Sequence, residues 1–103
     1  MNIRTAAGIA SIGAALLIAA SGAGAYTGQE LEKDAKVSMA QASAIAVKAR
    51  PGKITDRELE KEKGGSGLRY SFDVKSRGTT YEVGIDAVTG KVLEDAPEGK
   101  NPD

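Results

Sequence analysis

The chain has 103 residues, with 14 basic and 14 acidic side chains, a formal net charge of zero, and neither cysteine nor histidine. These absences exclude Ser-His-Asp and Cys-His catalytic arrangements, Cys/His zinc sites and an imidazole that titrates near neutral pH. The balanced charge argues against nucleic acid as the main partner, because binding to phosphates requires an excess of basic side chains.

The first 25 residues have the composition of a signal peptide. One basic residue, Arg4, precedes an uncharged, alanine-rich run that ends in the small residues Ala23 and Ala25 of an A-x-A motif. This pattern predicts cleavage before Tyr26, which would leave an exported protein without a stable membrane anchor. An uncleaved anchor is the alternative, since residues 6–25 are long enough to span a bilayer. These residues contain little leucine and valine, which makes a membrane anchor less favourable and favours cleavage.

The rest of the chain divides into three predicted parts. Residues 26–36 are polar and lack apolar periodicity, so we expect a solvated lead-in. Residues 37–95 hold the apolar patterns of one small domain, which has no disulfide and must rely on its core. Residues 96–103 are polar, contain proline and glycine, and are expected to form a flexible tail.

A helix is predicted where the domain begins, in the sequence VSMAQASAIAVKARPGK. Ser38 followed by Gln41 matches a capping box, and Pro51 ends the pattern. One apolar stripe at helical spacing consists of Ala42, Ile45, Ala46 and Ala49. Because this stripe is mostly alanine, it suits close packing against a sheet and is too thin to favour binding to a membrane surface.

A hairpin is predicted from the sequence YSFDVKSRGTTYEVGID. A two-residue turn at residues 77–78 pairs Phe72 with Val83 and Asp73 with Glu82, so that apolar residues face apolar residues. A three-residue loop would instead place Phe72 opposite Glu82. Since a slip of one residue inverts the faces of a strand, the two-residue turn is preferred.

A second hairpin is predicted in the stretch YEVGIDAVTGKVLEDA. A three-residue loop at residues 88–90 pairs Ile85 with Leu93, and Gly90 supplies the left-handed conformation that such a loop needs. The side chain of Asp86 is expected to accept hydrogen bonds from backbone amides of the turn. A calcium-binding loop is the alternative, but the two residues after Asp86 offer no oxygen ligands.

A glycine-rich loop precedes these hairpins, and it comprises Gly64, Gly65, Ser66 and Gly67. As a four-residue loop it places Leu59 opposite Phe72. In a regular strand Ile54 would then face the opposite side of the sheet from Leu59, so a bulge is expected between them. The loop lacks the Lys-Ser/Thr ending of a phosphate-binding P-loop and the second glycine of a nucleophile elbow. We therefore consider these four residues a candidate contact with a partner.

Together these elements predict an α+β fold, in which one N-terminal helix packs on a four-strand antiparallel meander sheet. The opposite face is expected to be mixed in sign and exposed to water. The carboxylate pair Asp73 and Glu82 lies on that face without an apolar pocket, so acid/base catalysis is disfavoured. We predict no catalytic residue, no cofactor and no metal ligand.

The order and spacing of these segments resemble the PepSY domain family. The matching parts are VSMAQASAIA, PGKI, ELEKE, YSFDV and YEVGIDAVTGKVL, which together cover residues 37–95. The family is associated with exported or membrane-attached bacterial proteins and with the propeptides of thermolysin-like metallopeptidases. The resemblance implies a non-enzymatic binding module in the periplasm or outside the cell, and it carries over no functional residues.

Three functions remain open at this point. The chain inhibits or regulates a peptidase in trans, through the glycine-rich loop or the charged edge strand at residues 54–63. Alternatively, it binds another envelope protein, such as the extracytoplasmic domain of a sensor, or acts as a holdase. A small enzyme or metal carrier is the least favoured, because carboxylates are its only strong metal-ligating side chains.

Overall fold

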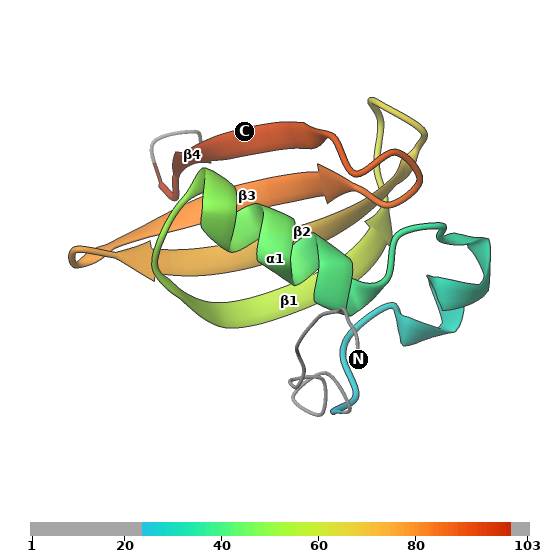
Figure 1. Cartoon of the computed structure of the whole chain (residues 1–103), viewed down its shortest axis with the longest axis horizontal. Coiled ribbons are helices and arrows are strands. Elements are labelled where there is room, and N and C mark those ends of the chain that lie inside the picture. Colours follow the sequence, from blue (N-terminus) through green and yellow to red (C-terminus); the bar gives the residue numbers. More distant parts are fainter. Residues whose placement is uncertain (1–23, 100–103) are drawn as a thin grey trace, which may run out of the picture.

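The computed structural model describes residues 24–99 and consists of one α-helix packed across one face of a four-stranded antiparallel sheet (Figure 1). The helix and strands are α1 (Met39–Ala49), β1 (Lys53–Lys61), β2 (Leu68–Ser76), β3 (Thr79–Asp86) and β4 (Val92–Pro97). The strands lie in the order β1-β2-β3-β4, so each pairs with its neighbour in sequence. The predicted α+β meander is confirmed.

Helix α1 begins at the predicted capping box. The amide of Gln41 donates to the hydroxyl of Ser38 at 3.0 Å, and the amide of Ser38 donates to the side-chain oxygen of Gln41 at 2.9 Å. Ala42 and Ala46 have no exposed surface. Their small side chains let the helix lie directly on the sheet. The helix ends at Ala49, just before the residue that precedes Pro51.

The hairpin of β2 and β3 has the predicted register. Phe72 pairs with Val83 and Asp73 pairs with Glu82. Arg77 and Gly78 both have positive φ, at 53° and 84°. Positive φ at both central residues is the requirement of a type I′ turn, whose twist matches that of the two strands. The prediction of a two-residue turn is therefore confirmed.

The hairpin of β1 and β2 has a wider loop than predicted. Leu59 pairs with Tyr70, and the predicted pairing with Phe72 is wrong. The last pair of the two strands is Lys61 with Leu68, so the loop comprises residues 62–67, and within it the amide of Glu62 donates to the carbonyl of Gly67 at 3.1 Å. A shift of two residues keeps every side chain on its predicted face. The bulge predicted after Ile54 is present.

The hairpin of β3 and β4 also differs from its prediction. Ile85 pairs with Val92, so the predicted pairing with Leu93 is wrong. The amide of Asp86 donates to the carbonyl of Lys91 at 2.8 Å, which makes the loop one residue longer. An irregularity between Gly84 and Ile85 absorbs the difference in register.

Ala87 explains the longer loop. Its side chain is fully buried, and its amide donates to the carbonyl of Leu68 at 2.9 Å. Its own carbonyl accepts from the amides of Lys36 and Val37, both at 2.9 Å. These contacts tie Ala87 to the entry of α1, so it cannot serve as the strand-closing residue that the shorter loop requires.

The polar lead-in is exposed but contains regular structure. It forms the 3₁₀ helix η2 (Gln29–Asp34), and Leu31 packs against the core. The carbonyl of Thr27 accepts a hydrogen bond from the amide of Leu59 at 2.9 Å, which attaches the segment to the outer edge of β1. Gly28 approaches the backbone of Leu59 so closely that a Cβ atom there would lie 1.7 Å from its carbonyl oxygen.

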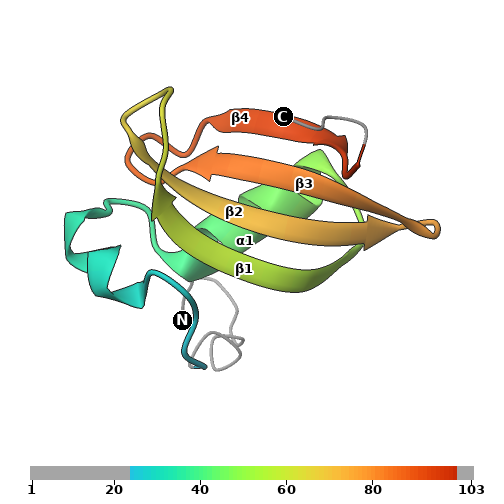
Figure 2. The same cartoon turned by 180° about the vertical axis from the view of Figure 1, so that it is seen from behind.

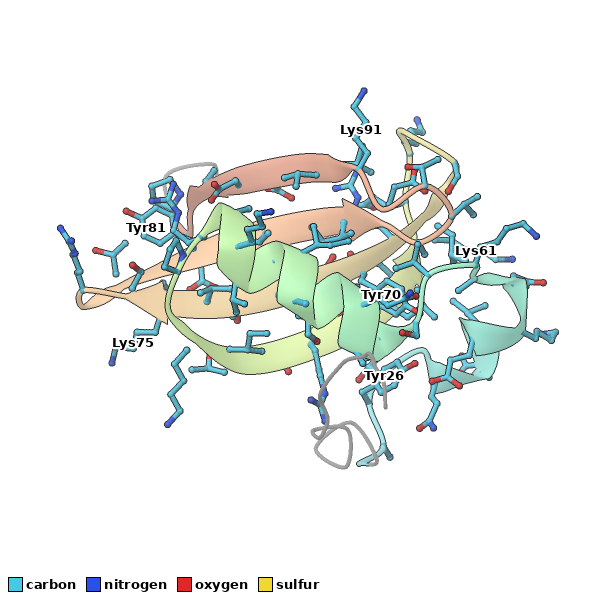
Figure 3. The ribbon with its side chains drawn as sticks, viewed as in Figure 1. Tyr26, Lys61, Tyr70, Lys75, Tyr81 and Lys91 are labelled. Atoms are coloured by element: carbon cyan, nitrogen blue, oxygen red, sulfur yellow. The ribbon has the colours of Figure 1, made fainter. Side chains whose placement is uncertain are left out.

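The core lies between α1 and the sheet. Its buried members are Met39, Ala42, Ala46, Leu59, Leu68, Tyr70, Phe72, Val74, Val83, Ile85 and Ala87. Tyr70 lies beside the N-terminal end of α1 (Figure 3), and its hydroxyl donates to the carbonyl of Val37 at 2.6 Å. This bond satisfies the one polar atom of a buried side chain and fixes the entry of the helix.

Candidate functional site

The sheet face opposite α1 is not covered by any element of the described residues, as Figure 2 shows. A shallow hollow in this face is lined by eight acidic residues: Asp56, Glu58, Glu60, Glu62, Asp73, Glu82, Glu94 and Glu98. We call these eight residues the acidic face. The predicted mixture of signs considered only β2 and β3. Carboxylates dominate the hollow, because six of the eight come from β1, β4 and the residues that follow these two strands.

Three strands place carboxylates side by side on the acidic face. Asp73 of β2 pairs with Asp56 of β1 on one side and with Glu82 of β3 on the other. Neighbouring strands lie about 4.8 Å apart, so these like charges are close together. Glu98 joins the row from beyond β4, since carboxylate oxygens of Asp73, Glu82 and Glu98 all lie within 4.8 Å of one another.

Partial burial and mutual repulsion make these groups harder to ionise. Burial, followed by the charges of Glu98 and Asp56, raises the pKa of Asp73. Burial, followed by the charges of Glu94 and Asp73, raises the pKa of Glu82. Like charges that face one another across strands oppose folding, so the acidic face costs the isolated domain stability.

Acidic residues occupy every second position along β1, at Asp56, Glu58 and Glu60, and the pattern continues to Glu62, the residue that follows the strand. Alternate residues of a strand share one face, so these side chains form a line along the edge of the sheet. The hydroxyl of Ser71 donates to Glu60 at 2.6 Å. The sequence analysis missed this line, although the alternation is visible in TDRELEKE.

Arg69 is a basic residue that borders the acidic face. Its guanidinium lies 3.5 Å from the carboxylate of Glu94 and donates to the carbonyl of Lys63 at 3.1 Å. To reach β4, the side chain crosses β3 at Gly84, where a Cβ atom would lie 2.9 Å from its Cδ. Arg69 is therefore engaged with Glu94 at one end of the face and does not neutralise the row around Asp73.

The carboxylates of Asp73, Glu82 and Glu98 are close enough to share one cation, and two of the three residues are exposed. Divalent ions such as Ca²⁺ take six to eight oxygen ligands. Three surface carboxylates supply only part of such a shell. The group is therefore better described as one portion of a larger acidic surface than as a metal centre.

The predicted contact loop, Gly64–Gly67, lies at one end of the sheet. Gly64, Gly65 and Gly67 have positive φ, and the amide of Ser66 donates to the carboxylate of Asp86 at 2.6 Å. Gly65 and Ser66 are exposed. The loop is thus presented to solvent but attached to the body of the domain. Whether it contacts a partner stays a prediction.

The side chain of Asp86 joins two loops. Besides Ser66, it accepts from the amides of Val88 and Thr89 at 2.8 and 3.0 Å, as predicted. Its side chain is buried, with 1% of its surface exposed. Burial opposes ionisation, but the backbone hydrogen bonds outweigh it and hold the pKa of Asp86 well below its usual range. This carboxylate has a structural role and is not available for acid/base catalysis.

The predicted signal peptide lies largely outside the described residues, and Ala23 is among those not described. Ala25 is exposed, whereas the ring of Tyr26 packs against the core and its hydroxyl donates to Glu32. Burial, followed by that hydrogen bond, raises the pKa of Tyr26. Within residues 24–99, no helix has the length and apolar character needed to cross a membrane.

Comparison with known families supports the resemblance seen in the sequence. Residues 36–96 match the PepSY model, described as "Peptidase propeptide and YPEB domain". Neither a curated protein nor a solved structure shows significant similarity to the chain. The matched region takes in α1 and all but the last residue of the sheet, and it is more than half of the 103 residues. The chain therefore belongs to the PepSY family.

Proposed function

We propose that this chain is an exported, non-catalytic module that binds a peptidase and restrains it in trans. The observation that carries the proposal is the family match, because the family is described by its occurrence in peptidase propeptides. The predicted signal peptide supports export. An uncovered sheet face next to an anchored, exposed loop supports a binding role.

The glycine-rich loop is suited to contact with a partner outside a catalytic cleft. Its positive φ values at Gly64, Gly65 and Gly67 differ from those of an extended strand, the form in which a peptide adds to a sheet edge. A loop of this shape is a poor mimic of an extended substrate. We therefore propose that the loop and the acidic face contact the peptidase without entering its active site in the manner of a substrate.

The test is a titration of the purified chain from Tyr26 onward into a panel of secreted metallo- and serine peptidases. Residual activity and the integrity of the added chain are followed together. Saturable inhibition of one class at a stoichiometric ratio, with the chain intact, is the expected result. Rapid digestion of the chain, or no inhibition of any peptidase, would refute the proposal and favour another envelope protein as partner.

A further inference from the structure

The spacing of charges along β1 and the residue that follows it matches that of an extended chain. The four carboxylates of Asp56, Glu58, Glu60 and Glu62 occupy alternate positions and line one surface. Alternate side chains of a strand repeat about every 6.7 Å. An extended segment with a basic residue at every second position has the same repeat. It can therefore place each of its charges opposite one of these carboxylates.

Around Asp73, the acidic face also lacks the counter-charges that a self-contained surface would have. None of the residues that line its hollow is basic, although the whole chain is neutral. Arg69 is held by Glu94 and by the carbonyl of Lys63. Lys61 and Lys75 extend outward near the ends of the sheet (Figure 3). The repulsion between Asp73 and its neighbours is thus unrelieved in the free domain and would be relieved by a basic partner.

From this geometry we infer that the acidic face binds an extended segment of a protein partner with lysine or arginine at alternate positions. The inference rests on the proposed function, since it assumes a protein partner, and it names the chemistry of the contact. The segment runs along β1 over the open face of the sheet. It does not pair with β1 as a fifth strand. The reason is that Thr27 already occupies the backbone edge at Leu59.

Two labelled peptides of identical composition test the inference. In one, four lysines alternate with four serines, and in the other the lysines precede the serines as a block. Binding to the purified protein is measured by fluorescence anisotropy at low ionic strength. We expect the alternating peptide to bind roughly tenfold more tightly, which corresponds to about 1.4 kcal/mol. Equal affinities would show that attraction is diffuse, and they would overturn the inference.

Matched variants locate the binding surface. The double variant Glu58→Gln/Asp73→Asn removes two charges from the acidic face and relieves repulsion, so it should remain folded. Glu30→Gln/Asp34→Asn removes two charges from η2, whose acidic side chains are exposed. The first variant should weaken binding of the alternating peptide by about tenfold and the second by less than about twofold. Equal losses in the two variants would refute the assignment.

Three further outcomes distinguish this inference from an ion-binding site and from the proposed function. If Ca²⁺ alone binds with the same dependence on Asp73 while neither peptide binds, the surface is an ion site and the inference is overturned. If the alternating peptide binds at the acidic face but no peptidase is inhibited, the inference is supported and the proposed function is refuted. Inhibition of a peptidase that survives Glu58→Gln/Asp73→Asn would support the function and overturn the inference.

Discussion

The amide of Ser66 lies 2.6 Å from a carboxylate oxygen of Asp86, and this bond joins the loop after β1 to the turn after β3. The same carboxylate accepts two amides of its own turn. Three donors around one buried charge form a small network that orders both loops at one end of the sheet. The orientation of the exposed loop therefore depends on a residue far from it in sequence.

Replacement of Asp86 by Asn should destabilise the domain by roughly 3 kcal/mol. An amide has one acceptor oxygen, so its NH₂ group must face at least one of the three backbone donors. Asp95→Asn is the control, because Asp95 pairs with Arg50 at the surface and should contribute less than about 1 kcal/mol. Urea unfolding measures both variants. Similar losses would contradict the role assigned to Asp86.

Two glycines of the exposed loop should respond differently to alanine. Both Gly65 and Gly67 have positive φ, so backbone strain in an alanine at either position should destabilise the domain by about 1–2 kcal/mol. A Cβ atom at Gly65 would also lie 2.2 Å from the carboxylate of Asp86, whereas nothing lies within 4 Å at Gly67. Gly65→Ala should therefore lower the unfolding free energy more than Gly67→Ala. Equal thermal stabilities would show that the loop is not held by Asp86.

Local patterns in the sequence predicted the helix and the central hairpin. The capping box of Ser38 and Gln41 involves neighbouring residues, and the pairing of Phe72 with Val83 follows from alternation on both strands. Such signals are local, so one sequence is enough to find them. The role of Asp86 in its own turn was predictable for the same reason.

The other two loops were predicted less well because contacts from distant segments set their lengths. Ala87 forms backbone hydrogen bonds with Leu68 and with the entry of α1, and no local sequence pattern predicts those partners. The acidic face was missed for a related reason. Its charges come from all four strands and the following segment, so its sign emerges only when the registers of β1 and β4 are known.

Gly28 should control the attachment of the lead-in to β1. Its φ is 89°, and a Cβ atom there would collide with the carbonyl of Leu59. Gly28→Ala should detach the segment, and the amide of Leu59, which donates to Thr27, should exchange with deuterium about tenfold faster or more. Gly99→Ala is the control, since Gly99 has φ of 85° and no atom within 4 Å. Unchanged exchange at Leu59 would contradict the attachment.

The acidic face should make the domain more stable in mild acid than at neutral pH. Asp73 faces Asp56, Glu82 and Glu98, and the pKa values of Asp73, Glu82 and Glu58 are all raised in the folded state. A carboxyl whose pKa is higher folded than unfolded binds its proton more tightly when folded. Stability is therefore gained as the pH falls from 7 toward the unfolded values of about 4.

Asp86 should reverse this trend at lower pH. Its pKa is lowered in the folded state, so its contribution is present above about 3.9 and is lost as the pH falls further. The melting temperature followed by circular dichroism should thus pass through a maximum between about pH 4 and pH 5. Asp73→Asn/Glu82→Gln should raise the melting temperature at pH 7 and reduce the difference between the melting temperatures at pH 7 and at the maximum. Glu30→Gln/Asp34→Asn should leave that difference unchanged. A wild-type melting temperature that falls steadily from pH 7 to pH 4.5 would show that repulsion on the acidic face does not limit stability.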